Sequence, residues 1–104
     1  TGDKGYTGDG KPAISATLNG PKAIRCDNEG NIVIVDTENH SIRLISIADD
    51  LINTIGGGAE GPHGDGSDPL KAGMARPHGV VVGPDNEIYI ADSENHRVRI
   101  IKQN

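Results

Sequence analysis

The chain has 104 residues, a net charge of −5 at pH 7 and only 2% aromatic residues. The negative charge argues against the phosphate backbone of nucleic acids and against anionic membrane surfaces as partners. The shortage of aromatic rings removes the platforms on which single-stranded nucleic acids stack, and no apolar stretch reaches the length that spans a membrane.

The apolar residues are mostly β-branched, which favours pleated sheets over helices. There are 13 Ile, 6 Val and 4 Leu, while the 15 Gly and 6 Pro lie mainly between the apolar runs, where turns need them. The sequence therefore predicts an all-β fold. Cys26 is the single cysteine, so an internal disulfide is excluded and the cellular compartment stays open.

The first half of the chain predicts a long turn-rich loop followed by four short strands. We expect the strands over residues 21–27, 32–35, 41–47 and 51–55. Residues 28–31, with the sequence Asn-Glu-Gly-Asn, are typical of a hairpin turn. Residues 36–40 form the turn into the third strand, and three glycines after the fourth strand open the next loop.

The second half repeats the first at a fixed offset of 56 residues, and 15 of the 48 positions that can be compared are identical. We expect strands over residues 77–82, 87–91 and 97–101, without a counterpart of the fourth strand. A fixed period of this size marks a repeat architecture, in which one unit buries its apolar faces only against a copy. The sequence therefore predicts two units, residues 1–56 and residues 57–104, the second lacking its outermost strand.

Four short antiparallel strands per repeat are typical of a β-propeller blade. The order Gly-Asp-Gly, Pro, strand, Gly-Asn-type turn, apolar strand, Asp-x-x-Asn-His and then an Arg-containing strand resembles the NHL repeat family, in its long-repeat bacterial form. The resemblance covers essentially the whole chain, although Gly61-Pro62-His63 departs from Gly5-Tyr6-Thr7. It implies a propeller, usually six-bladed, that serves mainly for binding and occasionally for lyase chemistry.

Two blades alone leave apolar faces and strand edges in water, which favours association. We expect three copies to form a six-bladed ring with closed cyclic symmetry, so the predicted partner is the chain itself. The alternative is that the chain, which begins at Thr1 within a motif, is an excised or engineered piece of a longer propeller.

The expected binding face combines the long loops with the turns between the second and third strands, which lie on one face of a propeller. Its candidate residues are Asp9, Asp36, Asn39, His40, His63, Asp65, His78, Asp92, Asn95 and His96. The repeated residues can instead have a structural role. Asp and Asn cap turns, and the repeated Arg43 and Arg99 can pair with the repeated aspartates. Catalysis needs one special site, so the recurrence of the same Asp, Asn and His residues in both repeats favours a structural role over a catalytic one.

His63 and His78 break the repeat, since Thr7 and Lys22 occupy the equivalent positions. A trimer would bring three His78 side chains towards its axis, which makes His78 a weak candidate metal ligand. The Gly8-Asp9-Gly10 segment offers too few oxygen ligands for calcium and favours a tight turn, in which Gly supplies positive φ. We therefore predict neither a metal nor a cofactor.

The sequence as a whole predicts a non-enzymatic propeller scaffold that self-assembles and offers a face to a protein or small-molecule ligand. The alternative is a metal-dependent propeller lyase or hydrolase, which would need ligands near the axis in several blades, and only His78 fits. Cys26 aligns with Val82, so we expect it to be a buried core residue rather than a nucleophile.

Overall fold

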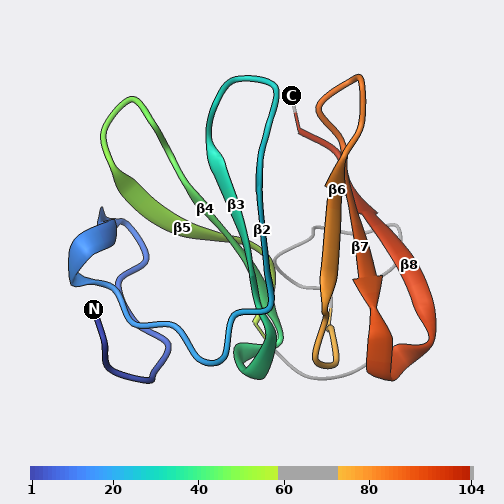
Figure 1. Cartoon of the computed structure of the whole chain (residues 1–104), viewed down its shortest axis with the longest axis horizontal. Coiled ribbons are helices and arrows are strands. Elements are labelled where there is room, and N and C mark those ends of the chain that lie inside the picture. The colour runs from blue at the N-terminus through green and yellow to red at the C-terminus, as the bar shows by residue number, and fades with distance from the viewer. Residues whose placement is uncertain (59–72, 104) are drawn as a thin grey trace.

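The computed structural model describes residues 1–58 and 73–103, which form two antiparallel sheets side by side (Figure 1). The sheet of the first repeat has the strand order β1-β5-β4-β3-β2, and the sheet of the second has the order β6-β7-β8. We call them blade 1 and blade 2. Among the described residues, no helix is long and apolar enough to cross a membrane.

Blade 1 contains the four predicted strands and one further strand. Its elements are β1 (Lys11–Pro12), the 3₁₀ turn η1 (Ala13–Ser15), β2 (Ala23–Cys26), β3 (Ile32–Asp36), the 3₁₀ turn η2 (Thr37–Asn39), β4 (Ser41–Ile45) and β5 (Leu51–Gly57). β1 pairs with the outer edge of β5, with Lys11 opposite Ile52. β1 could not be predicted from the sequence, because two residues carry no alternation. Its proline is compatible with an edge position such as this one.

Blade 2 contains the three predicted strands. Its elements are β6 (Gly79–Val82), β7 (Ile88–Asp92), the 3₁₀ turn η4 (Ser93–Asn95) and β8 (Arg97–Ile101). The β6–β7 and β7–β8 pairs keep the register of their counterparts in blade 1, so that Val80 lies opposite Ile90 as Ile24 lies opposite Ile34. The prediction of two propeller blades is confirmed.

The turns use residues that tolerate left-handed backbone. Gly30 has φ 85° in the β2–β3 turn, and His40 and His96 have φ 53° and 56° where η2 and η4 end. Histidine enters this region more readily than most side chains. The two Asp-x-x-Asn-His segments therefore fold alike, each as a short 3₁₀ turn closed by a left-handed histidine.

The core lies between the blades, where β2 and β6 run next to each other (Figure 1). Strand alternation separates a contact face from an outer face. Along β7, Ile88 and Ile90 are fully buried against blade 1, whereas Tyr89 between them is 37% exposed. The core cluster comprises Val33, Val35, Ile42, Met74, Val80, Ile88, Ile90 and Ile101.

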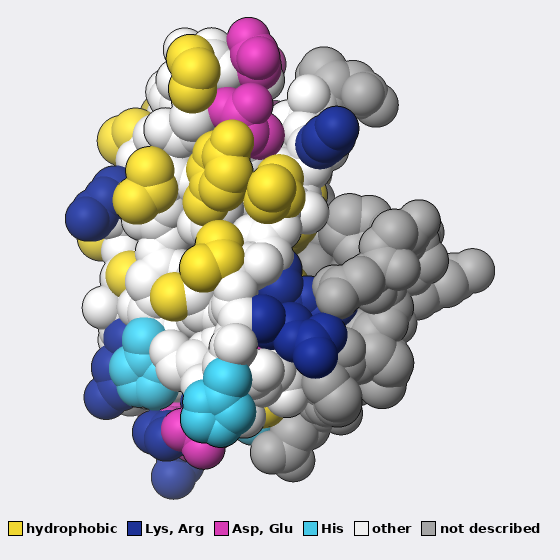
Figure 2. Space-filling view, turned by 90° about the vertical axis from the view of Figure 1, so that its right-hand side faces the viewer, with side chains coloured by type: hydrophobic (Ala, Val, Ile, Leu, Met, Phe, Trp, Pro, Cys, Tyr) yellow, Lys and Arg dark blue, Asp and Glu magenta, His cyan; other side chains and the backbone are white. Residues whose placement is uncertain are grey.

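The outer faces of the two blades carry exposed apolar side chains, four on blade 2 and Ile24 on blade 1, where Ile34 and Arg43 of the same face are buried. Figure 2 shows hydrophobic side chains gathered on the blade 2 side of the molecule, above histidine and charged side chains. We define the outer face of blade 2 by the exposed residues Val81, Tyr89, Val98 and Ile100. On the opposite side of the chain, Ile24 of blade 1 is 59% exposed.

Cys26 is exposed at the end of β2, so the expectation that it lies in the core is wrong. Its repeat partner Val82 lies on the strand face that packs against blade 1, while the same face of blade 1 meets solvent. Positions that are equivalent in the repeat thus differ in their surroundings, because only one blade has a neighbour on that side.

Candidate functional site

The two Asp-x-x-Asn-His turns and the segments that enter β2 and β6 lie at one end of the blades, the lower end in Figure 1. Backbone hydrogen bonds join each turn to the entering segment of its own blade, from Glu38 to Asn19 and from Glu94 to Ala75. We call this end the loop face. It holds most of the candidate residues that the sequence predicted.

The repeated aspartates are buried inside these turns. Asp36 and Asp92 have no exposed surface. One carboxylate oxygen of each accepts the backbone N–H of the entering segment, from Asn19 at 2.7 Å and from Ala75 at 2.8 Å. The other oxygen accepts the amide of the Asn three residues later, at 2.8 Å in both blades. These contacts occupy both oxygens of each carboxylate.

The repeated arginines hold the same aspartates from β4 and β8. Arg99 donates to Asp92 at 3.0 Å, and an Arg43 nitrogen lies 3.5 Å from Asp36, so the expected ion pairs are confirmed. Arg43 also donates to the carbonyl of Thr17 at 2.7 Å, and Arg99 donates to the carbonyl of Gly73 at the equivalent position. A buried charge is tolerable only when it is paired and hydrogen-bonded in this way.

Arg76 links the two blades on the loop face, although no sequence pattern singles it out. Its guanidinium donates to Glu38 of blade 1 at 2.8 Å and 3.1 Å, and lies 3.9 Å from Glu94 of its own blade. Its backbone N–H donates to Nδ1 of His40 at 3.0 Å. The hydrogen bond from Arg76 holds the pKa of Glu38 below its ordinary value and raises that of Arg76.

The histidines of the loop face differ in their surroundings. His78 is half-buried just before β6, and its Nδ1 lies 2.7 Å from the carbonyl oxygen of Arg76. His40 accepts the Arg76 amide, so its Nδ1 carries no proton in this arrangement. His96 is exposed, although its turn has the same conformation as that of His40.

Asp9 lies in the N-terminal loop of blade 1, 3.0 Å from Arg43. Gly8 and Gly10 flank it with φ 101° and 79°, as the tight-turn interpretation expects. His63 and Asp65 lie outside the described residues. Within the described residues, no group of three or more His, Cys, Asp and Glu side chains is arranged to hold a metal ion.

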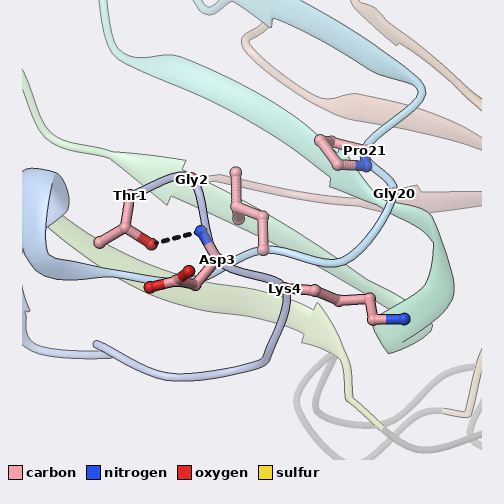
Figure 3. A pocket seen from close by; sticks show the side chains of 7 residues that line it. Thr1, Gly2, Asp3, Lys4, Gly20 and Pro21 are labelled. Atoms are coloured by element: carbon pink, nitrogen blue, oxygen red, sulfur yellow. Dashed lines mark hydrogen bonds between the residues drawn. The ribbon is translucent and has the colours of Figure 1, made fainter.

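Two depressions border the entering segment of blade 1. One, of about 300 Å³, is lined by the first four residues together with Leu18, Gly20 and Pro21, and Figure 3 shows the Asp3 amide bonded to the Thr1 hydroxyl at its rim. The other, of about 350 Å³, is more apolar. It is lined by Leu18, Pro21, Lys22, Ala23, Ile24 and Ile34. It therefore opens onto the outer face of blade 1.

Further polar contacts between the blades join residues that the repeat does not share. Asn28 of the β2–β3 turn donates its backbone N–H to Asn86 at 2.7 Å, and its side chain to the carbonyls of Gly83 and Pro84. Gln103 reaches back to Asp27 at 3.4 Å. Sequence periodicity could not find these residues, because it selects positions that recur.

Residues 74–101 match the profile of the NHL repeat. Over 82 residues, or 78% of its length, the chain is 37% identical to NHL repeat-containing protein 2 of Gallus gallus. Over 95% of its length it is 34% identical to teneurin-1 of Mus musculus. The chain spans only 11% and 4% of these two relatives, and 8% of the chloroplastic protein SUPPRESSOR OF QUENCHING 1 of Arabidopsis thaliana, to which it is 26% identical.

Solved structures share the fold. A protein of unknown function from Bacteroides thetaiotaomicron superposes on 94% of this chain with a TM-score of 0.78 at 22% identity, over 24% of its own length. An auxiliary nutrient binding protein from the same organism covers 96% with a TM-score of 0.76 at 23% identity, over 26% of its length. Another, described as a possible phosphatase, covers 98% with a TM-score of 0.72 at 17% identity, again over 26% of its length.

Proposed function

This chain belongs to the NHL-repeat family, and from its two propeller blades we propose that it is a non-enzymatic scaffold that self-assembles into a closed ring. In this proposal three copies supply six blades, and the ring presents the loop face to a protein or small-molecule partner. Closed cyclic symmetry leaves no blade face uncovered, whereas an open arrangement always leaves two.

The observation that carries the proposal is the presence of two opposite apolar outer faces on one small chain. Val98 and Val81 are 71% and 59% exposed on blade 2, and Ile24 is 59% exposed on blade 1. Apolar area removed from water contributes about 25 cal/mol per Å². A protein that exposes apolar faces of this kind associates or aggregates. A closed ring is an assembly with a finite number of chains, because it leaves no apolar face free to add another copy.

The chemistry of the loop face supports binding rather than catalysis. The carboxylates of Asp36 and Asp92 are fully buried and occupied by hydrogen bonds, so neither is available to transfer a proton to a substrate. A metal assay of protein purified without added metal separates this proposal from a metal-dependent lyase or hydrolase, which would retain about one metal ion per ring.

The test is the mass of the chain in solution at micromolar concentration, measured by multi-angle light scattering. The proposal expects a particle of about three chains, since three blade pairs close a six-bladed ring. Four chains would replace the six-bladed ring by an eight-bladed one. A monomer at every soluble concentration would overturn self-assembly.

A further inference from the structure

We propose that the outer face of blade 2 in one copy docks onto the outer face of blade 1 in a second copy, through contacts that reproduce the internal junction between the blades at an offset of 56 residues. This inference rests on the proposed self-assembly and specifies its geometry. The occupant of each face is a second copy of this chain, because the two faces are the unused halves of an interface that the chain already forms once.

Three of the four residues that define the outer face of blade 2 have apolar repeat partners in the internal junction: Tyr89, Val98 and Ile100 correspond to Val33, Ile42 and Leu44, whereas Val81 corresponds to Arg25. Val98 and Tyr89 are exposed, whereas their repeat partners Ile42 and Val33 are completely buried against blade 2. On the other side, Ile24 is 59% exposed while its partner Val80 is 4% exposed. The same sequence positions therefore form a packed core once within the chain and remain uncovered at its two flanks.

A buried hydroxyl contact has both of its repeat counterparts in place. Within the chain, the Thr37 hydroxyl donates to the carbonyl oxygen of Pro77 at 2.8 Å. The equivalent residues are Ser93 and Pro21, so the hydroxyl and the proline are both retained. Pro21 is exposed and lines the apolar depression beside Ile24. In the proposed dock, Ser93 of one copy donates to Pro21 of the next.

The histidine contact is retained as well. Nδ1 of His40 accepts the backbone N–H of Arg76, and the equivalent residues are His96 and Gly20. His96 has the same left-handed conformation as His40, with φ 56° against 53°. Gly20 has φ 61° and Arg76 has φ 45°, so the two entering segments present their amides in similar conformations.

The salt bridge of the internal junction is not retained. Glu38 pairs with Arg76 inside the chain, whereas the equivalent Glu94 would face Gly20 of the next copy. The Asn28–Asn86 contact likewise becomes Pro84 opposite Gly30. The dock between copies therefore depends on apolar packing and on hydrogen bonds to the backbone. It is weaker than the internal junction and insensitive to salt.

The first test restores the missing charge. Gly20→Arg recreates the Arg76 position, whose positive φ an arginine already adopts in this chain, and should pair with Glu94 of the next copy. Sedimentation equilibrium should show association strengthened by about two- to fivefold per interface at low salt, as an exposed ion pair gives. Gly20→Gln, which has a similar backbone demand but no charge, is the control. Adding Glu94→Gln to the arginine variant should abolish the gain, and a gain that survives this change would contradict the proposed contact.

The second test separates head-to-tail docking from other modes. Ile24→Asp places a charge only in the outer face of blade 1, and Val98→Asp places one only in that of blade 2. Both side chains are exposed, so both variants should fold, which thermal melting checks. Each variant alone should be monomeric, and their equimolar mixture should form a one-to-one pair through the two intact faces. If either variant alone still dimerises, the faces pair with themselves and the inference is wrong. If both variants keep the wild-type mass of three chains, self-assembly stands but uses another surface; a monomeric wild type instead removes the proposed function.

Discussion

Arg76 occupies the position that Gly20 holds in the first repeat, and it joins the two blades through Glu38 and His40. The repeated residues around it build each turn, while this unrepeated residue fixes how the turns meet. The salt bridge between the blades thus depends on a residue that differs between the two repeats. Such differences are visible in the sequence only as mismatches, which do not say what each side chain touches.

The two repeated histidines provide a test of these surroundings. His40→Asn removes the acceptor of the Arg76 amide but keeps a residue that tolerates the left-handed conformation. We expect it to lower the free energy of unfolding by about 1 kcal/mol. His96→Asn should cost only a few tenths of this in dissociated protein. Urea denaturation at submicromolar concentration measures both.

At concentrations where the chain assembles, the two histidine variants should become similarly damaging, because His96 then accepts an amide from the next copy. The periodic sequence alone predicts equal losses under all conditions. If both variants lost the same free energy of unfolding in the dissociated chain, the difference between the surroundings of His40 and those of His96 would be contradicted.

Two carboxylates at the blade junction predict a loss of stability in acid. The hydrogen bond from Arg76 holds the pKa of Glu38 below 4.5. Burial acts to raise the pKa of Asp27, but hydrogen bonds from Asn31, Glu29 and Gln103 outweigh it and hold the pKa below 3.8. Because folding lowers both pKa values, the stability that they contribute is complete above about pH 5 and is lost as the pH falls through the folded-state values.

Urea denaturation between pH 6 and pH 3 checks this dependence. The wild-type chain should lose stability on acidification, and Asp27→Asn should lose less over the same interval, since one of the two linked protons is removed. Stability that rises as the pH falls from 5 to 3 would contradict the sign.

At the end of β5, the backbone conformation requires a glycine. Gly57 has φ 73°, and a Cβ placed on it would lie 2.3 Å from the carbonyl oxygen of His40. Gly57→Ala should therefore destabilise the chain by about 1–3 kcal/mol from backbone strain alone, and by more from the clash. Gly79→Ala in β6 is the matched control, because its Cβ would meet only the Ala91 side chain at 3.7 Å without positive φ. Thermal melting compares the two, and equal melting temperatures would contradict the placement of β5.

The strands and their order followed from the sequence because two copies of one pattern reinforce each other. Alternation and turn residues located β2 to β5 and β6 to β8, within one or two residues of their observed ends. β1 was missed, since two residues have no periodicity, and β5 continues to Gly57 through glycines that propensity disfavours. The exposure of Cys26 could not be predicted from Val82, because burial depends on the neighbouring blade rather than on the strand.

At the scale of the whole molecule, the sequence predicted that the two turns lie on one face and that the repeated arginines pair with the repeated aspartates, but it did not predict the contacts between the blades. The loop face gathers both Asp-x-x-Asn-His turns, as the propeller pattern indicated, yet its aspartates act within the turns and its inter-blade contacts depend on Arg76 and Asn28. The same separation holds for the assembly. In the proposed assembly, repeated residues would supply the surfaces that fit a copy, and the unrepeated Arg76 and Asn28 would make the internal junction stronger than the junction between copies.

Intermolecular nuclear Overhauser effects between chains with different isotope labels would show which blade faces meet in the assembly. Val80 shares a core cluster with Val33 and Val35, so the equivalent Ile24 of one copy should lie beside Tyr89 and Ala91 of another. In a mixture of methyl-labelled and unlabelled chains, head-to-tail docking predicts cross-peaks from the Ile24 methyl group to the Tyr89 ring of a different molecule. Cross-peaks that join Ile100 to Ile100 or Val98 to Val98 across copies, or no intermolecular cross-peaks in an assembled sample, would contradict it.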